Sequence, residues 1–284
     1  MPNASHMDKT CTDTSSLENK TDTQSLLRKR FLDYIPAAHQ ERFDDKAMQE
    51  DVQRLASLTN KNPMIWYLYQ STAEAENQLH LKLYGNQKPT ILSDILPVLE
   101  NFGVSVITSQ TYTFDLAGQP VWIQEYELTL ANVDAVDMQV VRSQFEESLQ
   151  EIWAGRVEDD SFNELVLTTK LDTYEVVVLR ALSRYMHQAR AGFSIRYIKQ
   201  TMIKNSAISV LLAELFDAKM NPQYGAANDD ARTEKLTQIQ EQITTALAAI
   251  ESLDEDRILR WYLDLINAMV RTNFYQTDND GQRK

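Results

Sequence analysis

Cysteine and glycine are scarce in this 284-residue sequence, and their scarcity excludes several classes of site. The single cysteine, Cys11, rules out an internal disulfide framework and a cysteine-rich metal centre, and it suits a reducing compartment. The seven glycines form neither G-x-G-x-x-G nor G-x-x-x-x-G-K-[ST], and no H-E-x-x-H motif occurs. The sequence therefore predicts no phosphate-binding loop and no metal site.

Long apolar runs and basic charge are also lacking. No stretch approaches the roughly 18 apolar residues of a transmembrane helix, and the first residues lack the apolar segment of a signal peptide. The net charge of −13 argues against nucleic acid or an anionic membrane as the partner, because both select for basic surfaces. We therefore expect a soluble cytoplasmic protein that contacts neither nucleic acid nor membrane.

Side chains suited to catalysis are hard to find. The acidic runs at 158–160 and 254–256 are interpreted as a loop and a helix start, because neither has a partner for general acid–base chemistry. The arginines at 257, 260 and 271 indicate a solvated stripe or internal ion pairs, with an anion site as the alternative. The histidines, interpreted as solvated or hydrogen-bonded surface side chains, are His6, His39, His80 and His187. We predict no catalytic residue.

Strand and helix patterns alternate through the first half of the chain. The predicted elements are strands at 64–69 and 79–84, a helix at 90–102, strands at 104–114 and 121–130, and a helix at 142–153. From residue 79 this is strand, helix, strand, strand, helix, which is most of a ferredoxin-like unit. We expect residues 64–69 to supply the missing edge strand, antiparallel to 79–84. Ile91, Leu92 and Trp153 are predicted to face the core, and Gly103 to end the first helix.

The remainder of the chain is predicted to be helical, apart from its two ends. Residues 1–24 are polar and are expected to be a disordered leader, and 277–284 form a tail. Residues 25–155 are predicted to form one α+β domain, which begins with two helical pieces within 26–58 that are split near Pro36. A helical region spans 156–228, with a polar stripe of Arg180, Arg184, His187 and Gln188, and 229–276 form a helical hairpin. Within this region Ser194 and Ser206 are predicted to cap the helices that follow them.

The last predicted helix has a well-defined start. Ser252 and Glu255 fit a capping box, and acidic residues follow near the positive end of the helix dipole. Ile258, Tyr262, Leu265, Ile266 and Met269 form its apolar side, opposite a polar stripe of Arg257, Arg260, Asp264, Asn267 and Arg271. We expect part of this apolar side to remain exposed.

Several blocks together resemble one protein family. The block Lys88–Ile107 is similar to an ACT-type regulatory domain of the large NAD-specific bacterial glutamate dehydrogenases, and Trp122–Tyr126 and Phe145–Gly155 continue the resemblance. Further blocks are Phe162–Leu167, Leu179–Gln188, Phe193–Tyr197, Leu215–Asp217 and Ser252–Gln276. The resemblance covers roughly residues 26–276. It implies an α+β fold with an ACT-type, ferredoxin-like antiparallel sheet and two helices, followed by an all-helical region.

The resemblance also implies where a ligand would bind. ACT domains often hold an amino acid near the loop between the first strand and helix, which here gives the candidates Asn86, Lys88, Thr90 and Asp94. Backbone N–H groups at the helix start would hold a carboxylate. The glycine typical of such loops is missing after Pro89, and an ordinary surface turn is the alternative reading.

Two functions from different classes fit these observations. The first is a non-catalytic regulatory and oligomerisation region of an NAD-dependent glutamate dehydrogenase. Its partners would be the catalytic and other ACT-like domains, in a homo-oligomer. The family's substrate, catalytic and NAD-binding residues are expected beyond Gln276, so the parent would use NAD while this segment would hold no cofactor and be inactive. The second is a stand-alone amino-acid-sensing or protein-interaction module, and a helical scaffold is a third reading.

Overall fold

A computed structural model describes residues 45–71, 77–116, 119–130, 138–189, 192–224 and 230–277. The chain divides into two compact units, each treated by itself below. The first comprises the described residues up to Trp66 with 82–89 and 109–125, and the second comprises 67–81, 90–108 and the described residues from 126 onward. Within the described ranges, no helix is both long and apolar enough to cross a membrane. The predicted leader at 1–24 and the tail after 277 lie outside the described residues.

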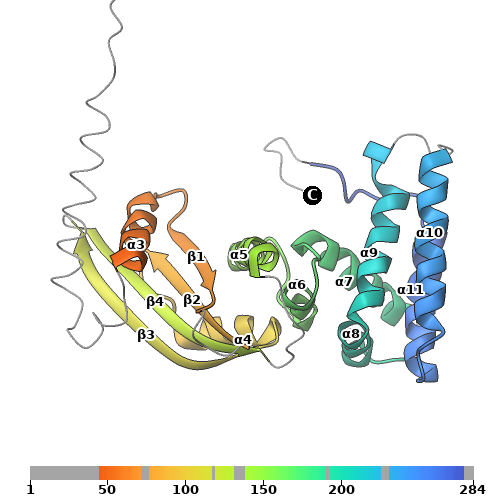
Figure 1. The fold of residues 1–284 in the computed structure, drawn as a ribbon, viewed down its shortest axis with the longest axis horizontal. Coiled ribbons are helices and arrows are strands. Elements are labelled where there is room, and N and C mark those ends of the chain that lie inside the picture. Colours follow the sequence, from red (N-terminus) through yellow and green to blue (C-terminus); the bar gives the residue numbers. More distant parts are fainter. Residues whose placement is uncertain are drawn as a thin grey trace, which may run out of the picture. The chain divides into compact units, whose positions relative to one another are not determined.

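The sheet has the predicted ferredoxin-like topology (Figure 1). Its strands are β1 (Met64–Tyr69), β2 (Gln78–Gly85), β3 (Val104–Leu116) and β4 (Gln119–Leu130). They lie antiparallel in the order β1-β2-β4-β3, so β1 pairs with β2 at the edge where the unit would otherwise have its last strand. The fold class is therefore α+β, as predicted. Residues 117 and 118, between β3 and β4, lie outside the described residues.

Three helices accompany the sheet: α3 (Asp45–Ser57), α4 (Leu92–Asn101) and α5 (Met138–Trp153). α4 begins later than predicted, with Ile91 as its N-cap, so Ile91 and Leu92 are 65% and 43% exposed instead of core. Trp153 was likewise expected to face inward but is 37% exposed at the last residue of α5. Gly103 follows α4 with a φ of 76°, the left-handed conformation expected of a helix-ending glycine.

Strand β2 is buried on both faces, which the alternating pattern did not predict. Leu79, Leu81 and Leu83 are at most 1% exposed, as expected for one face. On the other face His80 is 8% exposed and stacks on Tyr69, so the expectation of a surface histidine is wrong. His80 is buried because other elements of the protein pack over this second face of β2.

Helix α3 covers part of this face, as the ion pair between Asp51 of α3 and Lys82 of β2 shows. Asp51 comes from α3 and accepts a hydrogen bond from Lys82 Nζ at 2.7 Å and one from the Tyr84 hydroxyl at 2.5 Å. These three side chains are almost completely buried. A buried charge of this kind persists only when it is paired, so α3 and β2 supply each other's partner.

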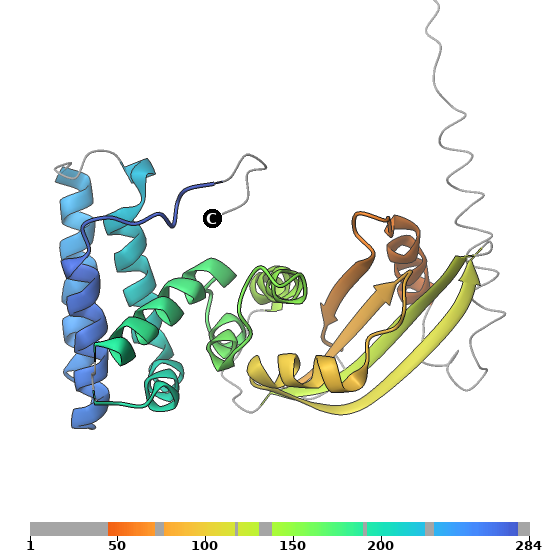
Figure 2. The same ribbon diagram turned by 180° about the vertical axis from the view of Figure 1, so that it is seen from behind.

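The second half of the described chain is helical, as predicted (Figures 1 and 2). Its elements are the 3₁₀ turns η1 (Ser161–Asn163) and η2 (Pro222–Tyr224) and the helices α6 (Glu164–Thr168), α7 (Thr173–Gln188), α8 (Ile195–Lys204), α9 (Ser206–Met220), α10 (Asp230–Leu247) and α11 (Leu253–Ala268). Ser194 and Ser252 cap α8 and α11 as predicted, by accepting from the backbone N–H groups of Tyr197 and Glu255. This is one half of the capping box predicted at α11, and the Glu255 carboxylate accepts from Lys204 Nζ and Asn205 Nδ2. α9 differs, because its N-cap is Asn205 and not Ser206.

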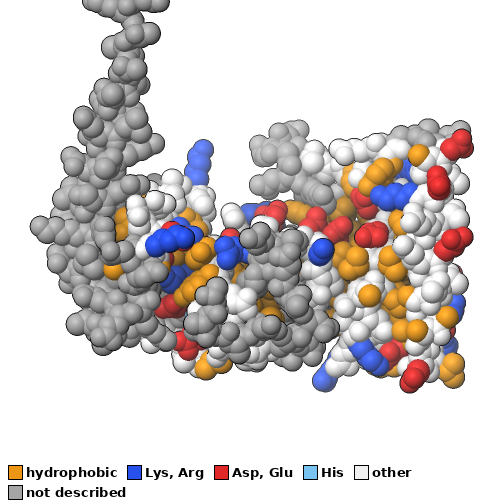
Figure 3. All heavy atoms as spheres, viewed as in Figure 1, with side chains coloured by type: hydrophobic (Ala, Val, Ile, Leu, Met, Phe, Trp, Pro, Cys, Tyr) orange, Lys and Arg blue, Asp and Glu red, His pale blue; other side chains and the backbone are white. Residues whose placement is uncertain are grey.

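The hairpin of α10 and α11 packs against α9 in both ribbon views (Figures 1 and 2). Its apolar side chains are core residues of this chain: Ile239, Ile243, Leu247, Ile258, Leu259, Tyr262 and Ile266 are at most 5% exposed. Of the five residues expected on the apolar side of α11, Ile258, Tyr262 and Ile266 are buried, while Leu265 and Met269 are half-buried, so part of that side does stay partly exposed. Strong exposure is confined to Leu253, at the start of α11, and Val270, just after its end. In the space-filling view of the helical region, hydrophobic side chains are visible between charged side chains of both signs (Figure 3).

Arg180 overturns another prediction. It was expected on the solvated stripe of α7 but is 4% exposed. Its Nη2 donates to Asn163 Oδ1 at 2.7 Å, and its Nε lies 3.1 Å from Asp160 Oδ1. Burial raises the pKa of Asp160, but Arg180 and Lys199 outweigh burial and hold that pKa below its ordinary value. The acidic run at 158–160 is thus an anchor for α7 and α8.

Candidate functional site

The predicted effector loop begins at a well-packed anchor. Trp122 Nε1 donates to the Gln87 carbonyl at 2.7 Å, and a Cβ added at Gly85 would lie 2.1 Å from the Trp122 ring. Asn86 is half-buried, and its backbone N–H donates to the Pro63 carbonyl at 3.3 Å, while Lys88 is exposed. This end of the loop belongs to the first unit.

Thr90 and Asp94 belong to the second unit. The Thr90 hydroxyl lies 3.4 Å from that of Tyr126, whose pKa is raised by burial and lowered in part by this contact. Asp94 is exposed in the first turn of α4, with its carboxylate 3.4 Å from the Ser93 hydroxyl. A ligand role for Asn86, Lys88, Thr90 and Asp94 stays a prediction, and none of the four lines the pocket described next.

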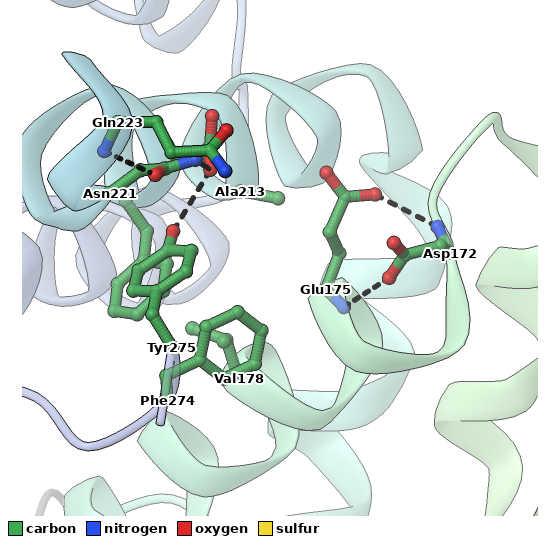
Figure 4. Close-up of a pocket in the computed structure, with 10 residues that line it drawn as sticks. Asp172, Glu175, Val178, Ala213, Asn221, Gln223, Phe274 and Tyr275 are labelled. Carbon is green, nitrogen blue, oxygen red and sulfur yellow. Dashed lines mark hydrogen bonds between the residues drawn. The ribbon is translucent and has the colours of Figure 1, made fainter. Parts of the chain in front are cut away.

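A pocket of about 190 Å³ lies within the helical region (Figure 4). Its walls come from the start of α7, the second half of α9, the turn after α9, and the residues following α11. We call residues 273–277 the strap. The lining residues are Asp172, Glu175, Val178, Ala213, Phe216, Asp217, Asn221, Gln223, Phe274 and Tyr275. These positions span more than a third of the chain, so only the tertiary fold brings them together.

The start of α7 supplies two carboxylates to the pocket wall. Asp172 accepts the backbone N–H of Glu175 at 2.8 Å, and Glu175 Oε2 accepts the backbone N–H of Asp172 at 2.8 Å (Figure 4). This reciprocal arrangement is a capping box. The sequence Asp172-x-x-Glu175 carries the signature of such a box, and sequence reasoning missed it.

The opposite wall is organised by Asp217 on α9. Its Oδ1 accepts from the Tyr275 hydroxyl at 2.9 Å and from Asn221 Nδ2 at 2.9 Å. Its Oδ2 accepts from the Tyr224 hydroxyl at 2.9 Å. Hydrogen bonds to a carboxylate are stronger than neutral ones, so Asp217 ties α9, the turn after it and the strap together.

The pocket has an acidic and aromatic character. Its ten lining residues include three carboxylates and three aromatic rings but no Lys, Arg or His. Carboxylates and ring faces both favour positive charge, so a small cationic group is the chemistry that this lining suits. Within the described ranges, no group of three or more His, Cys, Asp or Glu side chains is placed to hold a metal ion.

Glu175 should make stability depend on pH. Burial is the main cause that raises its pKa, and the nearby charges of Asp172, Asp217 and Glu214 raise it further. A carboxyl whose pKa is raised on folding stabilises the fold fully below the unfolded value of 4.5 and loses that contribution as pH rises through the folded value. At neutral pH the folded chain therefore carries a penalty.

We expect Glu175→Gln to raise stability at neutral pH by roughly 0.5 kcal/mol, because solvent screening limits the effect and the amide oxygen still accepts from Asp172. Urea unfolding between about pH 4 and pH 8 should show the gain shrinking toward the acidic end. Glu241→Gln, at an exposed position on α10, is the control. A loss of stability that is equal at every pH would contradict this account of Glu175.

Two further sets of contacts, away from the residues that line the pocket, hold elements of the second unit together. At one end, a Cβ added at Gly103 would lie 2.7 Å from Glu164 Cγ, so the turn after α4 rests on α6. At the other, Lys219 Nζ at the end of α9 donates to the carbonyls of Ile266, at 3.0 Å, and Asn267, at the end of α11. Burial lowers the Lys219 pKa. α11 is further fixed by Tyr262, whose hydroxyl donates to the Leu179 carbonyl at 3.1 Å.

Three family models match consecutive parts of the chain. Residues 63–141 match the ACT3 domain of glutamate dehydrogenase, and residues 157–222 match its helical motif 3. Residues 242–284 match the catalytic domain of bacterial NAD-glutamate dehydrogenase. The last match starts inside α10, earlier than the position after Gln276 at which catalytic residues were expected.

Curated relatives carry the same name. The chain is 38% identical over 251 residues to the NAD-specific glutamate dehydrogenase of Pseudomonas aeruginosa, covering 88% of this chain and 15% of that protein. It is 34% identical over 263 residues to that of Halomonas elongata, covering 93% and 16% respectively. The enzyme of the same name from Mycobacterium tuberculosis is 34% identical over 201 residues, covering 68% and 12%.

The chain thus spans less than a fifth of the length of these relatives. The ordered matches explain the architecture, since the ACT3 match contains the four strands and the motif match contains α6 to α9. The pocket adds one detail, because its α7 and α9 walls lie in the motif match whereas Phe274 and Tyr275 lie in the catalytic-domain match. The chain belongs to the family of bacterial NAD-specific glutamate dehydrogenases, as the segment that runs from the ACT3 domain into the start of the catalytic-domain match.

Proposed function

We propose that this chain is a non-catalytic regulatory and oligomerisation segment of an NAD-dependent glutamate dehydrogenase. The parent reaction would convert L-glutamate, NAD and water to 2-oxoglutarate, ammonia and NADH. The observation that carries the proposal is a continuous set of packed contacts in the second unit. It runs from α4, in the ACT3 match, through the helical motif to α11, in the catalytic-domain match.

The first link in this path is the end of α4. Gly103 packs on Glu164, and Asp159 accepts hydrogen bonds from Asn101 and from Asn163 Nδ2, the latter at 2.9 Å. Partial burial raises the pKa values of both Asp159 and Glu164, although the Asp159 side chain stays exposed and Glu164 is half-buried. A shift of α4 would therefore displace η1 and α6 directly, because packed side chains transmit strain.

The second link holds α11 on the helical motif. Tyr262 is fully buried and burial raises its pKa far above the ordinary value, so the phenol is a neutral hydrogen-bond donor to α7. Lys204 Nζ at the end of α8 lies 2.7 Å from Glu255 Oε1 near the start of α11. With Lys219 at the other end, both ends of α11 are fixed to the motif.

The edges of the sheet support the proposed homo-oligomer. At the β1 edge, the Leu68 backbone N–H donates to Glu146 Oε1 of α5 at 2.8 Å, which occupies a group that a further strand would need. β3 is the opposite edge, and it carries no charged residue from Val104 to Phe114. Ile107 on it is 55% exposed. A long uncharged edge strand is a ready surface for strand pairing.

The proposal makes a direct expectation for the purified chain. Incubated with L-glutamate and NAD, it should form no NADH above a blank without protein, because the parent's substrate and cofactor residues are expected to lie outside this segment. A full-length relative assayed under the same conditions is the positive control. NADH formation by the purified chain that depends on glutamate and scales with its concentration would overturn the proposal.

A further inference from the structure

The strap is seated on α9 by aromatic and polar contacts (Figure 4). The Phe274 ring meets Phe216 edge-on with centroids 5.4 Å apart, and the Tyr275 ring stacks on Phe216 at 6.2 Å. The Tyr275 hydroxyl donates to Asp217 Oδ1 at 2.9 Å. Phe216 is 5% exposed, so the strap covers an apolar side chain that would otherwise face water.

The packing under the strap is incomplete. The pocket of about 190 Å³ lies between it and the start of α7, so part of each strap ring borders open space instead of protein. Phe274 and Tyr275 are half-buried, and Asn273, Gln276 and Thr277 are exposed. By contrast, Ile258, Tyr262 and Ile266 of the preceding helix are fully buried. The strap is therefore less deeply packed than the helix that precedes it, which is typical of segments that open before the core does.

We propose that residues 273–277 are a releasable strap whose seating on Phe216 and Asp217 couples the helical motif to the segment matched by the catalytic-domain model. The seated and released states differ in the contacts made by α9, so any change that reshapes the end of α9 shifts the strap. The coupling is reciprocal, and pulling the strap away exposes Phe216 and frees Asp217. The releasable strap is inferred from these contacts and does not depend on the proposed parent activity.

The test compares two tyrosines that bond the same carboxylate. Tyr275→Phe removes the hydroxyl that reaches Asp217 Oδ1 from the strap, and Tyr224→Phe removes the one that reaches Oδ2 from η2. Each change keeps the ring. Hydrogen exchange of the full chain should show amides of the strap exchanging about tenfold faster in Tyr275→Phe, the effect of losing one hydrogen bond to a charged group. Amides of α9 and α11 should keep their protection.

In Tyr224→Phe, strap exchange should stay within about twofold of the parent chain. Chymotrypsin, which cuts after aromatic residues, gives a second readout because both variants retain the cleavage sites in the strap, and cleavage there should follow the exchange rates. Unchanged strap exchange in Tyr275→Phe would overturn the proposal. So would an equal loss of protection in α9 and α11, which would show that the strap opens only when the helical region unfolds.

Discussion

Tyr262→Ala is expected to destabilise the helical region by about 3–5 kcal/mol, the usual cost of removing a large buried aromatic side chain. Tyr262 has no exposed surface, and its ring occupies the contact between α11 and α7. Domains are stable by about 5–15 kcal/mol, so this one substitution should bring the region close to unfolding. Hydrogen exchange of α7 and α11 amides measures the loss locally, which matters because the chain divides into two units.

Two companion variants separate the contribution of the buried Tyr262 ring from that of its hydroxyl and from that of an exposed side chain on the same helix. Tyr262→Phe keeps the ring and removes the hydroxyl bond to Leu179, so it should cost about 1 kcal/mol. Leu253→Ala truncates an 81% exposed side chain of the same helix and should change stability by less than about 0.5 kcal/mol. If Tyr262→Ala cost no more than Leu253→Ala, α11 would not belong to the core of the helical motif.

The expected effect of Tyr262→Ala concerns the boundary between helical motif 3 and the segment matched by the catalytic-domain model. The catalytic-domain match starts at residue 242, yet Ile243, Leu247 and Tyr262 are buried against the helices of the preceding motif. The first helices of the catalytic-domain match therefore complete the core of helical motif 3. In the proposed function, a movement of that motif would be passed to the catalytic-domain segment through these packed side chains.

Local patterns in the sequence were sufficient to predict the sheet. The strand at 64–69 is short, aromatic and branched, and the alternation of Leu79, Leu81 and Leu83 marks the next strand. The βαββα order then leaves a single place for the extra strand, next to β2, and the structure has it there. Serine caps at 194 and 252 were equally readable, because a cap depends on residues within one turn.

Burial of polar residues could not be read from the same patterns. Arg180 follows the period of a solvated stripe, but its partners Asp160 and Asn163 come from a separate turn that folds over α7. Lys82 is likewise buried only because Asp51 reaches it from α3. Periodicity tells which residues share a face, but whether water or another element covers that face is decided by tertiary packing.

The candidate site likewise depends on tertiary packing that local sequence patterns do not reveal. The sequence-based prediction centred on a single loop, because loop residues are neighbours in sequence. The pocket instead gathers residues from 172 to 275, and its strap residues meet Asp217 only after α9, α10 and α11 have packed. The local signal available was the capping pair of Asp172 and Glu175, which is more often a helix start than a ligand site.

The contact between Gly103, just after α4, and Glu164, the first residue of α6, is the point at which we expect the proposed regulatory path to be most sensitive. Gly103 has a φ of 76°, and a Cβ added at this position would lie 2.7 Å from Glu164 Cγ. Gly103→Val would add left-handed strain of about 1–2 kcal/mol and would also press α4 away from α6. Gly155 has a φ of 70° with nothing within 4 Å of its built Cβ, so Gly155→Val adds the strain without the pressure.

The most direct measurement is the initial rate of glutamate-dependent NADH formation by a full-length enzyme carrying this segment, compared between Gly103→Val and Gly155→Val. Mutations along a path that couples two sites typically change the coupling free energy by about 0.5–2 kcal/mol. We therefore predict that Gly103→Val lowers the rate by about fivefold and that Gly155→Val leaves it near that of the parent enzyme. Equal rates in the two variants would contradict the account, because the ACT-like sheet would then have no influence on catalysis through the helical motif.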